Sequence, residues 1–196
     1  MIADGKRGDV PVTAAAYAQA LVGETPTPWG PVAGLGADAF TANPLLGRDA
    51  LEPLLGAAAS AGAGVFILVR TTNPGAAELQ DTPAGEPLHE RLAALVADSA
   101  GQLAGSGILS GSGAVIGATA PDLIGRLRVL MPRSIFLVPG VGAQGGRAAD
   151  LGPAFIPGEA ASAIVPVSRA IASASEPAAA AEQFRVQIWE ASGARA

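Results

Sequence analysis

The feature that most constrains the fold of this chain is a regular alternation of short apolar runs with longer helical stretches. Apolar runs of roughly four to eight residues, bounded by glycine and proline, are typical of buried strands. Two parallel strands need a crossover between them, and that crossover is usually a helix. The alternation therefore predicts an α/β fold built on a parallel sheet.

The pattern divides into six successive strand–helix units. Strands are expected in the opening segment before Gly8 and at residues 37–42, 64–70, 114–118, 134–138 and 163–167. Helices are expected at residues 11–22, 48–61, 87–103, 121–130 and 177–190, with a short helix around Ala148. Loops or turns are expected at residues 23–36, 71–85 and 111–113.

Six units leave two architectures open. A complete eight-unit barrel typically has about 250 residues, and the 196 residues here are close to six-eighths of that length. The pattern thus fits a (β/α)8 TIM barrel that lacks its first two units, and it also fits an open doubly wound sheet. No long linker divides the sequence, so we expect residues 1–196 to form a single domain.

The composition excludes several classes of function. The hydrophobic content is 49%, but no apolar run reaches the roughly 18 residues that a membrane-spanning helix needs. A net charge of −5 argues against broad binding to nucleic acid, which requires a basic surface. The absence of cysteine excludes disulfides and cysteine-based metal sites. Charged residues interrupt any apolar signal at the start, so we expect a cytoplasmic protein.

The opening segment carries an Asp-x-Lys-x-x-Asp spacing at Asp4, Lys6 and Asp9. Side chains two residues apart in an extended segment point to the same face, so Asp4 and Lys6 should project side by side. Asp9 lies beyond a bend at Gly8 and should point elsewhere. Two interpretations remain: a solvated turn, or an active site in which carboxylates hold Lys6 charged as a proton donor.

A second motif is the glycine-rich stretch at residues 139–146, where Gly140, Gly142 and Gly145 formally match G-x-G-x-x-G. A dinucleotide site is disfavoured, because that fingerprint should follow the first strand of a βαβ unit and this stretch follows the penultimate strand. Because small residues leave the backbone amides of such a loop accessible, the loop could equally well bind a phosphate. Arg169, after the last strand, is a surface arginine or a phosphate ligand. Together the two features predict a phosphorylated small substrate.

Two further features each have two interpretations. The stretch from Thr71 to Gly75 follows the most apolar strand, and its hydroxyl and amide groups could bind a polar heterocycle or simply form a turn. The single histidine, His89, stands at the start of a helix with a polar face. We favour a solvated helix residue over a catalytic one.

These stretches, in this order, resemble orotidine 5′-phosphate decarboxylase, in its longer bacterial, mycobacterial-type branch. The segment from Asp4 to Val10 matches the family's Asp-x-Lys-x-x-Asp-Ile/Val signature. Residues 139–146 match its phosphate loop, and Ser168-Arg-Ala-Ile matches the end of its final strand. The resemblance runs from Met1 to about Trp189.

The resemblance implies a barrel homodimer with active sites at the subunit interface and no metal or cofactor. It implies conversion of orotidine 5′-monophosphate to uridine 5′-monophosphate and carbon dioxide, in pyrimidine biosynthesis. Lys6 would protonate C6 of the pyrimidine, Asp4 would crowd the substrate carboxylate and hold Lys6 charged, and Asp9 with Thr13 would reach the partner subunit's site. The residues implied for substrate binding are Thr72 for the pyrimidine and Pro139, Gln144, Gly145, Gly146 and Arg169 for the phosphate.

The sequence departs from the family at its start. It begins at the strand that corresponds to the family's third, so an Asp of the first strand and a Lys of the second have no counterpart. We therefore expect a truncated form of a longer enzyme. A non-catalytic phosphate-binding module and a related magnesium-dependent sugar-phosphate lyase or synthase remain as alternatives, since sister enzymes share the Asp-x-Lys-x-x-Asp strand.

Overall fold

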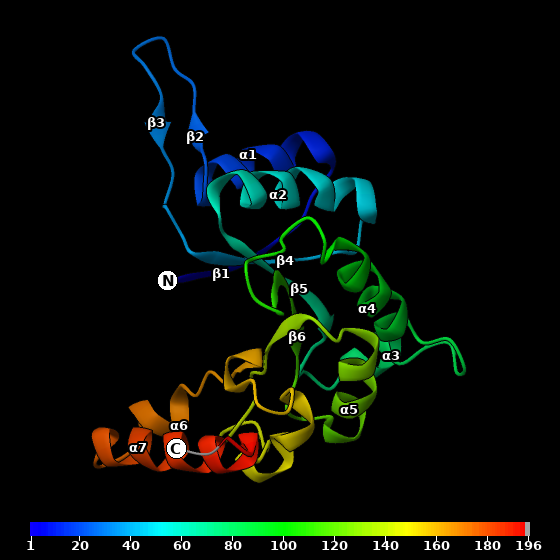
Figure 1. Cartoon of the computed structure of the whole chain (residues 1–196), viewed down its shortest axis with the longest axis vertical. Helices are drawn as coiled ribbons and strands as arrows, with labels where there is room; N and C mark the ends of the chain where they lie inside the picture. Colours follow the sequence, from blue (N-terminus) through cyan, green and yellow to red (C-terminus); the bar gives the residue numbers. More distant parts are fainter. Residues whose placement is uncertain (195–196) are drawn as a thin grey trace.

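The computed structural model describes residues 1–194 and shows one curled sheet with helices on its outer face (Figure 1). The last two residues of the expected 1–196 domain lie outside the described residues. The main sheet consists of β1 (Ile2–Arg7), β4 (Ala39–Ala42), β5 (Gly64–Arg70), β6 (Ser110–Ile116), β7 (Ser134–Leu137) and β8 (Ala163–Ile164). A separate two-stranded hairpin consists of β2 (Glu24–Thr25) and β3 (Val32–Ala33).

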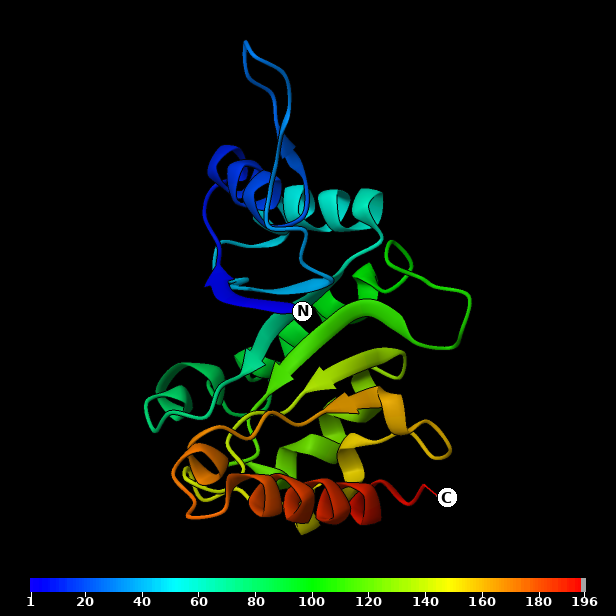
Figure 2. The ribbon, with the colours of Figure 1, turned by 90° about the vertical axis from the view of Figure 1, so that its left-hand side faces the viewer.

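The order of the strands decides between the two expected architectures. Every pair in the main sheet is parallel, and the order is β1-β4-β5-β6-β7-β8, so that strands consecutive along the chain are also neighbours in the sheet. A doubly wound sheet would reverse direction at a switch point. One-way winding with curvature, visible in Figure 2, is the geometry of a TIM barrel. The chain therefore forms a six-stranded part of a barrel.

Helices connect the strands and cover the outer face of the sheet. The longer helices are α1 (Pro11–Leu21), α2 (Arg48–Ala61), α4 (Leu88–Ser99), α5 (Pro121–Leu130) and α7 (Pro177–Ser192). The short ones are α3 (Ala76–Gln80), η1 (Ala148–Ala154), η2 (Ala160–Ser162) and α6 (Arg169–Ala172). Within the described residues, no helix is long and apolar enough to cross a membrane.

The core has two layers because β-strand side chains alternate between the faces of the sheet. Val65 and Ile67 of β5 belong to the large cluster that packs against the helices. Phe66 of β5 belongs instead to a smaller cluster on the inner, concave face, together with Val115 and Leu137. The first cluster fixes the helices on the sheet, and the second fills part of the barrel interior.

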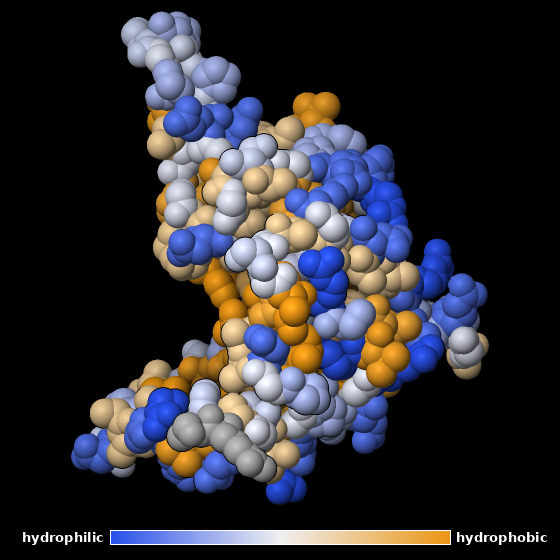
Figure 3. Space-filling view, viewed as in Figure 1, coloured by the Kyte–Doolittle hydropathy of each residue, from blue (hydrophilic) through white to orange (hydrophobic). Residues whose placement is uncertain are grey.

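Both edges of the sheet lack a neighbouring strand among the described residues, since β1 pairs only with β4 and β8 only with β7. Beside β8 lies an apolar groove of about 430 Å³ whose lining includes Val165, Val167, Phe184 and Trp189. Figure 3 shows apolar side chains where the surface is hollowed between the α1–α2 part and the α6–α7 part. The barrel is thus open on one side, where both edges and the inner face are accessible.

Several expected boundaries were wrong. Residues 111–113, expected as a flexible turn, belong to β6, and a Cβ on Gly113 would lie 2.6 Å from the ring of Phe66. Glycine is required there by close packing rather than by a bend. Conversely, β8 has two residues instead of the five expected at 163–167. The expected loops at 23–36 and 71–85 contain the β2–β3 hairpin and α3.

The expectation that His89 is solvated was also wrong. Its side chain is buried, and its Nδ1 lies 2.8 Å from the carbonyl oxygen of Gln80 and 3.1 Å from Oδ1 of Asp81. The reason is α3, which the sequence pattern did not predict and which places the Gln80–Asp81 segment over the start of α4. His89 also lies on the face of α4 that buries Leu92 and Val96, so the helix itself directs its side chain inward.

Arg128 of α5 fixes the segments that precede β7 and β8. Its guanidinium lies 3.5 Å from the centre of the Phe136 ring, and burial lowers its pKa to about 10, so it stays charged at neutral pH. It donates to the carbonyl oxygens of Met131, Ser134, Ala154 and Ser162. A single side chain thus satisfies four backbone acceptors from three separate segments.

Replacing Arg128 should destabilise the fold substantially. Arg128→Met leaves four partly buried carbonyls without the guanidinium donor, and at about 1 kcal/mol for each carbonyl we expect a loss of about 4 kcal/mol in the free energy of unfolding. The measurement is urea denaturation followed by circular dichroism. Arg133→Met is the matched control, because Arg133 is exposed and donates to a single carbonyl. An equal effect of the two variants would contradict the assignment.

Candidate active site

The candidate residues come from the carboxyl ends of different strands. Lys6 lies near the end of β1, Thr72 follows β5, and Arg169 opens α6 after β8. The stretch at residues 139–146, called here the glycine loop, follows β7. In parallel barrels the loops at this end of the sheet build the active site, so the topology brings these distant segments to one face.

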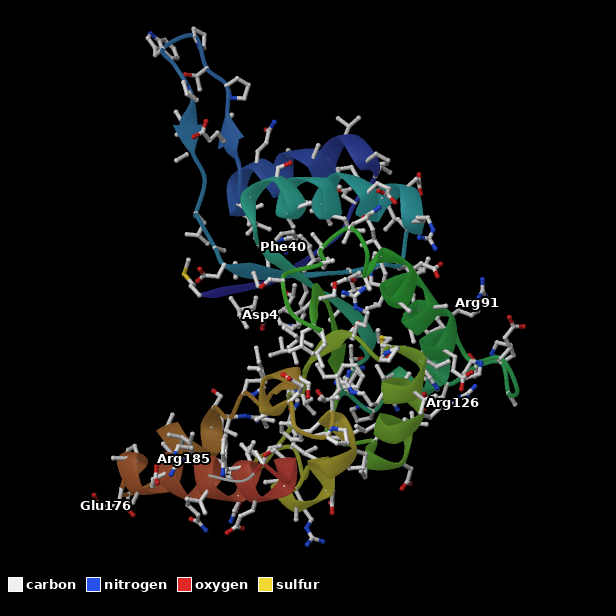
Figure 4. All side chains as sticks on the ribbon, in the orientation of Figure 1. Asp4, Phe40, Arg91, Arg126, Glu176 and Arg185 are labelled. Atoms are coloured by element: carbon white, nitrogen blue, oxygen red, sulfur yellow. The ribbon has the colours of Figure 1, made fainter. Side chains whose placement is uncertain are left out.

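Asp4 and Lys6 project side by side, as expected from their spacing. Lys6 Nζ lies 2.6 Å from Oδ1 and 2.7 Å from Oδ2 of Asp4. The pair is half exposed, with 48% of the Lys6 side chain and 58% of the Asp4 side chain accessible. Figure 4 shows Asp4 and Phe40 on opposite sides of the β1–β4 ribbon, so that Asp4 faces away from the α1–α2 layer.

The backbone at Lys6 is unusual. Lys6 has φ +48°, and among residues 1–194 it is the only residue other than glycine with a positive φ. Left-handed geometry at a side chain of this size is uncommon and costs of order 1 kcal/mol or more. The β1–β4 register also shifts between Ala3 and Arg7. The segment that carries the Asp4–Lys6 pair therefore departs from regular strand geometry.

Thr41 of β4 is a site residue that the sequence analysis missed. It is buried, its Oγ1 accepts a hydrogen bond from the Lys6 amide at 2.8 Å, and the same Oγ1 donates to Asp4 Oδ1 at 2.9 Å. One hydroxyl thus fixes both the irregular backbone and the carboxylate. The available signal was a hydroxyl residue within an otherwise apolar strand that pairs with the charged strand.

The surroundings of Asp4 favour its ionised form. Partial burial acts to raise its pKa, but hydrogen bonds from Lys6 and Thr41, together with the charge of Lys6, hold the pKa of Asp4 below its ordinary value of 3.8. Asp4 is therefore a carboxylate at neutral pH, and it faces an ammonium that it helps to orient. Such a pair can deliver a proton from nitrogen to a substrate atom placed against Lys6.

Asp9 and Thr13 are not part of this pair. The Asp9 carboxylate accepts a hydrogen bond from the Val10 amide at 2.7 Å, and Thr13 lies half buried on the first turn of α1. The chain turns at Gly8, where a Cβ would lie 2.3 Å from the carbonyl oxygen of Asn43. Within residues 1–194 the ion pair of Lys6 is with Asp4 and not with Asp9.

Thr72 and Gln144 join the end of β5 to the glycine loop. Gln144 Nε2 donates to Thr72 Oγ1 at 3.1 Å. The Thr72 methyl group is closely packed: a Cβ on Gly117 would lie 2.9 Å from it, and a Cβ on Gly140 would lie 3.0 Å from it. Glycine at these two positions is what lets the three strand ends approach each other.

The glycine loop is closed by its own hydrogen bonds. The amide of Gly145 donates to Gly142 at 2.8 Å, and the amide of Gly146 donates to Gly140 at 3.0 Å. Phosphate binding by the amides of Gly145 and Gly146 would therefore require the loop to exchange these bonds. The Gly146 amide bond holds the loop against the segment that begins at Pro139.

Arg169 lies beside the glycine loop. A Cβ on Gly142 would lie 2.8 Å from the Cβ of Ala170, so the loop and the start of α6 are in contact. The Arg169 side chain is exposed, and within residues 1–194 it forms no ion pair. A guanidinium next to a glycine-rich loop suits a bound phosphate.

No three metal-ligating side chains cluster anywhere in the described part of the chain.

Comparisons with known proteins give consistent similarity to one family. The model of the "Orotidine 5'-phosphate decarboxylase / HUMPS family" matches residues 1–184. A curated orotidine 5′-phosphate decarboxylase of Rhodopirellula baltica is 41% identical over 97% of this chain and 61% of the relative. One from Deinococcus radiodurans is 42% identical over 87% of this chain and 58% of the relative. The chain thus spans about 60% of the length of these relatives.

Solved structures show the same similarity. The OMP decarboxylase of Leishmania donovani is 31% identical, with a TM-score of 0.77, over 98% of this chain and 68% of that one. The UMP synthase of the same organism is 33% identical, with a TM-score of 0.75, over 97% of this chain and 39% of that one. The partial barrel described above therefore superposes on a large part of solved barrels.

The role of Thr41 can be tested through the titration of Asp4. Thr41→Val removes one of the hydrogen bonds that stabilise the carboxylate, so the pKa of Asp4 should rise, as measured by carboxyl-carbon NMR. Because the folded pKa is depressed, Asp4 stabilises the fold above pH 3.8, and this contribution is lost as the pH falls through the folded pKa. The variant should therefore show a smaller loss of stability on acidification. Thr25→Val, on the exposed hairpin, should leave the titration unchanged.

Proposed function

Because this chain belongs to the orotidine 5′-phosphate decarboxylase / HUMPS family, we propose that the protein decarboxylates orotidine 5′-monophosphate to uridine 5′-monophosphate and carbon dioxide. The observation that carries the proposal is the Asp4–Lys6 pair, held by Thr41 at the carboxyl end of β1. An ammonium fixed at a strand end is the group that this reaction needs.

In the proposed reaction, the bond between C6 of the pyrimidine and its carboxylate carbon breaks. The electron pair stays on C6 while carbon dioxide leaves, and a proton from Lys6 Nζ then forms the C6–H bond. Lys6 stabilises the developing negative charge before it transfers the proton. Asp4 has two tasks: it lies against the substrate carboxylate and it keeps Lys6 charged and oriented.

The remaining candidates would bind the parts of the substrate that do not react. The Thr72 hydroxyl would contact the pyrimidine, and Gln144 would link the Thr72 position to the phosphate. Arg169 would pair with the phosphate beside the glycine loop, with rearranged amides of Gly145 and Gly146 as further donors. Binding energy from the distant phosphate would be used to hold C6 against Lys6.

The protein would act as a homodimer that places Asp9 and Thr13 at the partner subunit's site. An apolar surface supports this assembly, because Val12 is 84% and Leu45 74% exposed. Val12 lies on the first turn of α1 and Leu45 follows β4, and the segments that precede them are adjacent, since the Asn43 amide donates to the Arg7 carbonyl at 2.8 Å. Exposed apolar clusters of this kind mark protein interfaces. Asp9 and Thr13 are close to Val12 along the chain, on either side of it.

The chemical proposal is tested by following the absorbance of orotidine 5′-monophosphate with the whole protein. Lys6→Met should lower kcat by about 10²- to 10⁴-fold, the usual contribution of a positioned proton donor. Arg48→Met, on an exposed ion pair, is the control and should keep wild-type activity. Equal activity of Lys6→Met and the wild type would rule out the assigned role.

Two other outcomes would favour the alternatives. Binding of uridine 5′-monophosphate without any loss of orotidylate absorbance would indicate a non-catalytic phosphate-binding module. Activity on a ketose phosphate that disappears with EDTA would indicate a magnesium-dependent sugar-phosphate lyase or synthase.

The dimer is tested by sedimentation velocity. Leu45→Glu places a charge in the apolar surface, so we expect it to dissociate the dimer and to lower activity at the same time. Val129→Glu is the matched control, because Val129 is 72% exposed on α5, away from this surface. A wild-type protein that sediments as a monomer would refute the dimer, as would a Leu45→Glu variant that remains dimeric.

A further inference from the structure

A partly buried polar cluster lies next to Thr72 along the chain and takes no part in the proposed chemistry. Arg70, the last residue of β5, is 8% exposed. Its Nε lies 2.8 Å from Oδ1 of Asp81, and its Nη2 lies 3.0 Å from Oδ2 of the same residue. Hydrogen bonding to Arg70 holds the pKa of Asp81 below its ordinary value, so the pair is charged at neutral pH. His89 closes the cluster from α4.

This cluster converges on Thr71, the residue before Thr72. Arg70 Nη1 donates to the carbonyl oxygen of Thr71. Gln80, the last residue of α3, uses both ends of its amide: Oε1 accepts from the Thr71 amide at 2.7 Å, and Nε2 donates to Thr71 Oγ1 at 3.0 Å. All three polar groups of Thr71 are therefore held by Arg70 and Gln80.

Thr72 is restrained as well, because its backbone continues directly from Thr71, whose amide, carbonyl and hydroxyl are all hydrogen-bonded. Its own hydroxyl accepts from Gln144 at 3.1 Å, and its carbonyl accepts from Thr119 Oγ1 at 3.3 Å. Thr72 is thus held on one side by the glycine loop and the segment after β6, and on the other by the cluster. A hydroxyl fixed on both sides loses little conformational entropy when it binds a ligand.

We propose that Gln80 and the Arg70–Asp81 pair are positioning residues that set the orientation of the Thr72 hydroxyl, and thereby the affinity of the site for a pyrimidine base. They act through Thr71 and do not touch the substrate. The role rests on the proposed function, in which Thr72 contacts the pyrimidine. It predicts an effect on base recognition that is separate from phosphate binding, because Arg169 lies on a different strand end.

The test compares two ligands by titration calorimetry with the whole protein. Uridine 5′-monophosphate carries the base, and ribose 5-phosphate lacks it. Gln80→Leu should weaken uridine 5′-monophosphate binding about three- to tenfold, the usual range for one hydrogen bond, and leave ribose 5-phosphate binding within twofold. Gln102→Leu, whose exposed amide contacts only Glu52 among the described residues, should change neither affinity.

A double-mutant cycle with Thr72→Val separates positioning from general damage. If Gln80 acts through Thr72, the double variant should bind uridine 5′-monophosphate no more weakly than Thr72→Val alone. Additive losses would overturn the proposal, as would an equal loss of ribose 5-phosphate affinity in Gln80→Leu. Unchanged uridine 5′-monophosphate affinity in Gln80→Leu would overturn it too.

A measurement without ligand tests the positioning of Thr72 independently of the proposed function. The order parameter of the Thr72 methyl group, measured by NMR, should fall in Gln80→Leu and stay at the wild-type value in Gln102→Leu. An unchanged order parameter in Gln80→Leu would overturn the positioning role even if the protein binds nucleotide. A wild-type protein that binds neither ligand, with the methyl group loosened as expected, would instead refute the proposed function and leave the positioning of Thr72 established.

Discussion

The candidate site depends on one hydroxyl, that of Thr41. The Asp4–Lys6 pair sits on an edge strand with irregular register and a left-handed residue, a geometry that isolated strand pairing would not maintain. Thr41 replaces the missing ladder contact by accepting from the Lys6 amide, and it donates to Asp4 with the same oxygen. Thr41 is buried, and its backbone pairs with β5 in the sheet. Its hydroxyl therefore has a fixed position, and this position in turn fixes the Asp4–Lys6 pair.

The second constraint is close approach between strand ends. Gly117 and Gly140 leave room for the Thr72 methyl group, and Gly142 leaves room for Ala170. These contacts bring the ends of β5, β6 and β7 and the start of α6 into one surface. Any side chain at these glycines would separate Thr72 from the glycine loop, or the glycine loop from the start of α6. The glycine pattern is therefore a requirement of the site's geometry rather than of chain flexibility.

Two largely buried charged groups, Arg128 and the Arg70–Asp81 pair, stabilise two different parts of the molecule. Arg128 joins the segments before β7 and β8 at the amino ends of these strands, through four carbonyls and the Phe136 ring. The Arg70–Asp81 pair works at the opposite end, where it fixes the segment that precedes Thr72. The first stabilises the scaffold, and in our proposal the second tunes recognition. Each is satisfied by hydrogen bonds, as a buried charge must be.

The sequence by itself determined the features that depend on neighbouring residues along the chain, such as helix bounds and the facing of side chains on a strand. Helix periodicity and proline starts placed residues 48–61 and 121–130 correctly, and the period of two in a strand predicted that Asp4 and Lys6 project together. The motif order identified the family, and six units of this length suggested part of a barrel. Strand order, which separates a barrel from a doubly wound sheet, has no local signal and required the structure.

Tertiary structure alone decided the features that depend on contacts between distant segments. Residues 111–113 read as a turn because glycine and serine are turn formers, yet burial of satisfied serine hydroxyls and packing against Phe66 make them a strand. His89 has its polar partner only because the end of α3 lies against α4, and Thr41 acquires its role only because β4 pairs with β1. Hydrogen bonds between residues that are nine to 37 positions apart leave no periodicity in a sequence, which is why these contacts could not be predicted from it.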